Sequence, residues 1–249
     1  MTNKSSQSGS EQGRRKHDSI RDDEKEEKHK QSTAGSNRPD PTSSILALQD
    51  TLCYVREFLA KPNPHLGRKG PTCPFVPKCL KMDSIHMATI SNNVAESVED
   101  MEKILLQLMR VFINIEPKDG PLMTYKAIIL IFPDLSLDDA PENIDNLQRR
   151  LKPTFVSEGL MLGEFHLHNN ATGLHNDSFY PLRTPFPSLA IRHMVPSDIV
   201  FLNPAEIDGP TRKNMIETFL KKFGSDSSKS DNAQVTLAKK LLNEFENEE

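Results

Sequence analysis

The chain has 249 residues and a formal net charge of −4 at pH 7. This acidic balance disfavours a nucleic-acid-binding protein, which usually carries a basic face, and no run of about 18 apolar residues predicts a transmembrane helix. The start of the chain is polar and lacks the apolar core of a secretory signal, and the cysteines number three, which is odd. We therefore expect a cytoplasmic protein.

Composition divides the chain into three parts. Residues 1–44 are crowded with Ser, Gln, Lys, Glu and Asp and hold one isoleucine and one alanine. Such a segment cannot bury enough apolar surface to offset its chain entropy, which predicts a disordered tail. Residues 45–223 are expected to form one globular domain, and residues 224–249 a polar linker and a peripheral C-terminal helix.

Apolar periodicity predicts the elements of the domain. Spacings of three and four between apolar residues predict a helix over 43–60, which Pro62 ends. Five prolines and two glycines then predict irregular structure over 61–80. Short alternating or continuous apolar runs predict strands over 84–90, 125–132, 160–167 and 188–194. The same helical periodicity predicts helices over 98–115, 141–156, 206–223 and 233–246, with a single turn over 196–202.

About four strands and several helices limit the fold class. The strand count is too small for a large doubly wound sheet. We expect an α+β or three-layer α/β domain, with a small mixed or antiparallel sheet flanked by helices.

The most polar part of the domain lies between the last two predicted strands. Residues 164–195 contain four of the eight histidines, in a loop between apolar runs, where binding and catalytic groups often lie. If the third strand continues through His166 and His168, both face one side and could bind one metal ion, with His175, Asp177, Glu164 or His193 as a further ligand. The alternative is that one histidine packs in the core and the other caps the loop.

Two arginines and one asparagine of this loop are candidate ligand-binding residues. The planar guanidinium groups of Arg183 and Arg192 suit a carboxylate or phosphate. A buried Arg192 needs either a carboxylate partner or an anionic ligand, and an exposed arginine paired with Asp or Glu is the alternative. Asn170 either builds the turn or holds a polar ligand through its amide.

The proline-rich stretch contributes a cysteine. Cys73 is a candidate thiolate ligand or nucleophile, although a buried, inert cysteine is more common. Five residues separate it from Cys79, which is more than a zinc knuckle typically has. The chain has no GxxxxGK[ST], GxGxxG, HExxH or GxSxG pattern, which disfavours P-loop, Rossmann, zincin and α/β-hydrolase proteins.

Two stretches together carry a family resemblance. The stretches PNPHLGRKGPTCPFVP (62–77) and FHLHNNATGLHN…PLRTPFPSLAIRHMVPSD (165–198) resemble a bacterial and fungal domain of unknown function with Leu-Gly-Arg-x-Gly-Pro-x-Cys-Pro-Phe-Val and Leu-Ala-Ile-Arg-His-Met motifs. The resemblance covers most of residues 45–223 and implies no settled activity. It implies that the two stretches form one site.

A second resemblance is more distant. The order Cys-Pro-Phe, Phe-His, Gly-Leu-His is similar to that of heme-dependent N-oxygenases that hydroxylate guanidine groups. The residues that carry it are Cys73, Pro74, Phe75, Phe165, His166, Gly173, Leu174 and His175. It implies a heme whose axial ligand is His166 or His175. The residues after Gly-Leu-His depart from that family's pattern.

We therefore expect a small-molecule enzyme, with the heme- or iron-dependent oxygenase of a biosynthetic pathway as the version that the resemblance implies. The predicted catalytic residues are His166, His175 and Arg192. The predicted ligand-binding residues are Cys73, Phe75, Asn170, Arg183 and His193. The predicted metal ligands are His166, His168 and His175.

Two alternatives remain open at this point. One is a non-catalytic module that binds a small ligand or assists a partner. The other is a metal-free acid–base enzyme with a His–Asp pair, for instance His175 and Asp177. In every version the expected partner is a small molecule, not a nucleic acid or a membrane, and no pattern indicates an oligomeric state.

Overall fold

The computed structural model describes residues 41–91, 97–224 and 233–248. Its helices are α1 (Pro41–Cys53), α2 (Val76–Lys81), α3 (Val98–Asn114), α4 (Asn146–Ser157), α5 (Gly209–Phe223) and α6 (Ala233–Glu248). Shorter helical turns are η1 (Tyr54–Leu59), η2 (Pro64–Leu66), η3 (Met123–Tyr125), η4 (Pro141–Asp145) and η5 (Pro196–Phe201). The strands are β1 (Ile85–Thr89), β2 (Ala127–Ile131), β3 (Leu160–Phe165) and β4 (Ser188–His193).

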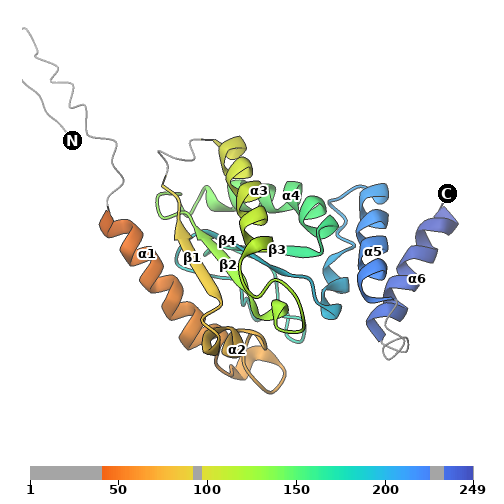
Figure 1. Ribbon diagram of the computed structural model, residues 1–249, viewed down its shortest axis with the longest axis horizontal. Coiled ribbons are helices and arrows are strands. Elements are labelled where there is room, and N and C mark those ends of the chain that lie inside the picture. Colours follow the sequence, from red (N-terminus) through yellow and green to blue (C-terminus); the bar gives the residue numbers. More distant parts are fainter. Residues whose placement is uncertain (1–40, 92–96, 225–232, 249) are drawn as a thin grey trace, which may run out of the picture. The chain divides into compact units, whose positions relative to one another are not determined.

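The strands form one mixed sheet with the order β1-β2-β4-β3. β1 and β2 are parallel, and β4 runs antiparallel to both β2 and β3. The expected α+β class with a small mixed sheet is confirmed, and Figure 1 shows the sheet between helices. In the part of the chain that the structure describes, no helix has the length and apolar character needed to cross a membrane.

The largest core lies between one face of the sheet and the helices α3 and α4. The apolar stripe of α3 supplies Leu105 and Phe112, and the inward residues of β3 and β4 include Leu162 and Ile191, all with 1% exposure or less. Ser97 caps α3 by accepting a hydrogen bond from the backbone N–H of Asp100 at 3.2 Å. Periodicity and capping therefore agree with the burial of this helix.

A second core joins the β3 edge of the sheet to α5 and α6. Met161 of β3 packs there with Ile216 and Phe219 of α5 and with Ala238 of α6. Val235 and Ala238 are 1% exposed or less, so α6 is built into this part of the fold more firmly than its predicted peripheral position suggests.

Two predicted boundaries differ from the structure in ways that affect the site. The predicted tail included residues 41–44, which form the first turn of α1, and the rest of that prediction lies outside the described residues. The third strand ends at Phe165 and not at Leu167, because the backbone turns so that His166 O accepts a hydrogen bond from Asn169 N. His166 and His168 therefore do not alternate along a strand.

Candidate functional site

The two motif-bearing stretches, 62–77 and 165–198, lie against each other. The side-chain amide of Asn176 donates a hydrogen bond to His65 O at 2.7 Å. Gly67 has a φ of 75°, and a Cβ at this position would lie 2.5 Å from His175 O, so only a glycine allows the close approach. The predicted contact between the two stretches is confirmed.

Aromatic side chains extend this contact to η1. The Tyr54 ring stacks on Phe58 with a centroid distance of 5.2 Å and meets Phe165 edge-on at 6.4 Å. Phe58 in turn lies 5.9 Å from Phe179 of the polar loop. The Tyr54 hydroxyl donates a hydrogen bond to Pro181 O. These rings hold the long loop 166–187 against the N-terminal part of the domain.

Arg192 projects from β4 and finds a carboxylate within the chain. Its Nη1 and Nη2 donate to the two carboxylate oxygens of Asp198 at 2.7 Å each. Asp198, with a side chain only 2% exposed, also accepts a hydrogen bond from Val195 N at 2.8 Å. Burial lowers the pKa of the guanidinium, but hydrogen bonds and charge attraction from Asp198 outweigh this effect, so the pKa is raised. The ion pair with Asp198 therefore keeps the Arg192 guanidinium protonated and fixes its orientation.

Cys73 lies within electrostatic reach of Tyr54 and Arg192. The pKa of Tyr54 is raised mainly by burial and further by Cys73, and Cys73 adds a small contribution to the raised pKa of Arg192. Cys73 is half-buried, whereas Cys79 is buried, and burial raises the pKa of the Cys79 thiol to about 11. Cys79 is therefore the buried, unreactive cysteine of the two.

The sheet beside these groups is incompletely covered. A row of paired residues crosses all four strands: Met87, Ile129, Ala190 and Gly163. Each of them is half-buried, although β2 and β4 are central strands. Gly163 and Ala190, which carry the smallest side chains of this row, lie on the same face of the sheet as Arg192.

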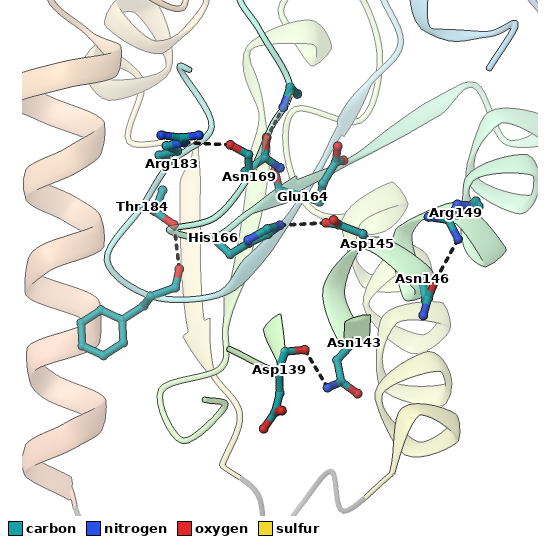
Figure 2. A network of polar contacts seen from close by, with 12 residues as sticks. Asp139, Asn143, Asp145, Asn146, Arg149, Glu164, His166, Asn169, Arg183 and Thr184 are labelled. Carbon is teal, nitrogen blue, oxygen red and sulfur yellow. Dashed lines mark hydrogen bonds and ion pairs between the residues drawn. The ribbon is translucent and has the colours of Figure 1, made fainter. Parts of the chain in front are cut away.

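His166 forms a different polar group at the end of β3. Its side chain is 1% exposed, and its Nε2 lies 2.9 Å from Oδ1 of Asp145 in η4, as Figure 2 shows. Its Nδ1 is buried and has no hydrogen-bond partner among the described residues. The contact with the Asp145 carboxylate fixes the orientation of the His166 ring.

Two buried charged residues accompany this pair. Glu164 lies beside it in Figure 2, and burial raises the pKa of its carboxyl while the backbone and Lys152 oppose that effect. Burial lowers the pKa of Lys152 in α4, and the nearby carboxylates of Glu164, Glu206 and Asp198 counteract it. This end of β3 thus gathers opposite charges in a half-buried setting.

Asn170 and Arg183 build the loop between β3 and β4. Arg183 Nε donates to Asn169 O at 2.9 Å, and its Nη2 donates to Oδ1 of Asn170 at 3.3 Å. The guanidinium also lies over the Tyr180 ring, 4.0 Å from the centroid. Asn169 caps the turn by accepting from Ala171 N at 2.9 Å. These contacts agree with loop construction, and a ligand-binding role for Asn170 and Arg183 stays a prediction.

The three predicted metal ligands lie in separate surroundings. His168 is half-exposed and 3.8 Å from Asp138, and His175 is exposed on the loop. Across residues 41–91, 97–224 and 233–248, no three His, Cys, Asp or Glu side chains gather in a way that could hold a metal ion. His166 lies in the core, as the alternative for His-x-His expected of one histidine, whereas His168 lies at the loop surface and the loop-capping role expected of the other stays a prediction.

The same placement bears on the heme that the distant resemblance implies. An axial histidine needs a ring nitrogen that faces the space occupied by the macrocycle. His166 is enclosed and bonded to Asp145 through Nε2, and His175 lies on the surface. Neither residue, as placed, fits that role.

The predicted residues therefore divide between the two faces of the sheet. Arg192 and Cys73 share one face. His166 lies near α4 on the other, and since Met161 pairs with Arg192, five residues of strand, about 16 Å, also separate His166 from Arg192. His193 likewise turns to the α3 side, with its ring 4.9 Å from Phe112.

Some members of both groups escaped the sequence-based prediction. Tyr54, Asp145 and Asp198 lie in helical segments, and each reaches its partner only through the fold. Phe75, predicted to bind ligand, packs 6.0 Å from the Tyr125 ring. No local signal in the sequence pairs Asp198 with Arg192.

Comparison with known proteins agrees with the first resemblance. A family model described as Domain of unknown function (DUF6875) matches residues 48–234. The comparison with curated proteins gave no match, and neither did the comparison with solved structures. The similarity to N-oxygenases stays a prediction. Because the family model spans most of the chain, including both motif-bearing stretches, the chain belongs to the DUF6875 family.

Proposed function

We propose that this protein is an enzyme that acts on a small molecule bound against the sheet face where stretches 62–77 and 165–198 meet. The observation that carries the proposal is the convergence of these stretches, which brings Cys73, Tyr54 and Arg192 beside half-buried Ala190 and Gly163. Functional side chains from distant parts of a chain that meet over a rigid sheet are typical of binding and catalytic sites.

Arg192 is the residue best placed to orient a substrate. A guanidinium has five N–H donors, and the hydrogen bonds of Arg192 to Asp198 and His193 O use three of them. The remaining donors can bind a carboxylate or carbonyl group. The pairing with Asp198 fixes the plane of the guanidinium, which reduces the entropy lost when a ligand binds.

The reactive group on this face is Cys73. A half-buried thiol near a guanidinium has the surroundings in which cysteines become nucleophiles or ligands. The acid–base role predicted for His166 stays a prediction, because its pair with Asp145 lies on the other face of the sheet from Cys73 and Arg192. The proposal names no cofactor; a heme or iron oxygenase is the version that the distant resemblance implies.

A non-catalytic ligand-binding module is the second candidate. The full bidentate pairing of Arg192 with Asp198 and the enclosure of His166 favour it, because both groups are held rather than free to transfer protons. Such a module binds its ligand and leaves it unchanged.

The full-length chain, purified with added heme and iron, tests the two candidates. An absorption spectrum and metal analysis decide the oxygenase version. Thermal unfolding with free arginine, its guanidino analogues and small carboxylic acids identifies stabilising ligands, and mass spectrometry then measures their conversion. We expect conversion that Cys73→Ser and Arg192→Lys reduce at least tenfold.

Cys53→Ser is the matched control, because Cys53 is exposed on α1 and should leave both binding and conversion unchanged. A ligand that stabilises the protein and is never converted would reject the enzyme in favour of the binding module. Equal losses of conversion in Cys73→Ser and Cys53→Ser would show that Cys73 has no specific role in the reaction.

A further inference from the structure

An open cavity of about 290 Å³ lies beside His193, which is on the opposite face of β4 from Arg192. The turn around η3, the end of β4 and the end of α5 line it. Its lining includes Met123 and Thr124 from the first, His193 and Met194 from the second, and Lys222 and Phe223 from the third. The size approaches that of sites for small organic molecules.

His193 lines this cavity, and its imidazole has no hydrogen-bond partner among the described residues. The residue is 6% exposed, and both ring nitrogens are buried without a partner among the described residues. One ring face packs against Phe112. Leaving a buried polar atom unpaired is costly, so a ligand in the cavity that bonds to the imidazole would remove this cost.

Two lysines make the surroundings of His193 positive. Lys126, which precedes β2, is buried, and its Nζ donates to Ile115 O at 2.8 Å and lies 4.6 Å from the centre of the Phe112 ring. Lys222 donates to Gly159 O at 3.3 Å. Burial lowers the pKa of His193, and Lys126 and Lys222 lower it further, to about 4. Among the described residues that line the cavity, none has an acidic side chain.

Gly159 lets Lys222 reach this position. Its φ is 70°, and a Cβ here would lie 2.7 Å from the Lys222 Nζ. The turn between α4 and β3 thus provides room for the ammonium group beside the end of β4, where Gly159 O also accepts from Met194 N.

We propose that this cavity binds a small organic anion, with its carboxylate between Lys222 and His193 and its apolar body against Met123, Met194 and Phe223. A carboxylate accepts hydrogen bonds from both an ammonium group and an imidazole N–H. The two methionines and the phenylalanine offer an adaptable apolar surface. This site is separate from the proposed enzymatic site, because Arg192 and His193 are consecutive residues of β4 on opposite faces.

Titration of the full-length chain with hexanoate tests the proposal by NMR. The ¹³C-labelled methyl groups of Met123 and Met194 and the His193 ring report on the cavity. We expect saturable shifts at these three residues and a rise in the pKa of His193. Hexan-1-ol, which has the apolar chain without the charge, and inorganic phosphate, which has charge without the chain, should bind at least tenfold more weakly.

Lys222→Gln should weaken hexanoate binding roughly tenfold, since it removes one charge-assisted hydrogen bond. Lys221→Gln is the matched control, because this exposed neighbour carries the same charge outside the cavity. Absence of saturable shifts, equal binding in the two variants, or tighter binding of phosphate than of hexanoate would overturn the proposal. His193→Gln is not required, so a folding defect at that position leaves the test intact.

Discussion

Arg192 and His193 stand next to each other on β4, and their surroundings differ in one decisive way. Arg192 turns toward the two motif-bearing stretches and is bonded on both Nη atoms to Asp198. His193 turns toward α3, and neither nitrogen of its ring has a hydrogen-bond partner among the described residues. On the Arg192 side of β4, which carries the sequence motifs, the chain itself supplies the hydrogen-bond partners of the polar groups. On the His193 side, buried ring nitrogens have no partner. Unmet hydrogen-bonding capacity is the better indicator of a ligand.

The largest loss of stability is expected when the ion pair between Arg192 and Asp198 is removed. Asp198→Ala leaves Arg192 without its carboxylate and Val195 N without an acceptor, and should lower the free energy of unfolding by about 3 to 4 kcal/mol. Urea unfolding of both proteins measures this difference. Asp138→Ala is the control, because the Asp138 side chain is 96% exposed and should change stability by less than about 0.5 kcal/mol. A loss below about 1 kcal/mol for Asp198→Ala would show that Arg192 is not held by this pair.

The unpaired imidazole of His193 should make the free energy of unfolding depend on pH. The pKa of His193 is about 4 in the folded chain and about 6.5 when unfolded, so the unfolded chain binds more protons between these values. The stability present above pH 6.5 is therefore lost as pH falls toward 4, by about 2 to 3 kcal/mol. His193→Gln should lack this part of the pH dependence. Unfolding free energies of both proteins at pH 7 and 4.5 provide the comparison, and parallel curves would contradict it.

The smallest effect separates the two residues of the His-x-His pattern. His166→Ala removes a fully buried ring and its bond to Asp145, which should cost about 1 to 2 kcal/mol of stability. His168→Ala removes a half-exposed ring and should stay within about 0.5 kcal/mol. Thermal and urea unfolding of the pair measure the difference. Equal losses would mean that burial does not distinguish the two histidines.

Much of the fold was predictable because its elements are periodic. The apolar stripe of α3, the continuous run of β2 and the helical pattern of α5 all lie within a few residues of their predicted bounds. The prediction for β3 ran two residues too far. Local apolar alternation continued to Leu167, whereas the end of the strand depends on a turn at His166 and Asn169 and on the reach of His166 to Asp145.

The sequence predicted which segments form the site but not which side chains contact one another there. The two stretches around Cys73 and His166 share a family resemblance, and they do lie together. His166 and Arg192 were expected to act in one group, but His166 lies just beyond the end of β3 and is held by Asp145, whereas Arg192 of β4 is held by Asp198 on the other face of the sheet.

The sequence by itself determined the elements, the two motif-bearing stretches and the presence of several histidines and arginines between β3 and β4. These follow from local periodicity and residue type, which do not require knowledge of what lies nearby. Only the tertiary structure decided that Arg192 meets Asp198, that His166 meets Asp145, and that His193 stays unpaired beside Lys222. Hydrogen bonds and burial depend on distances between residues far apart in the chain, and those distances are set by the packing of the sheet and its helices.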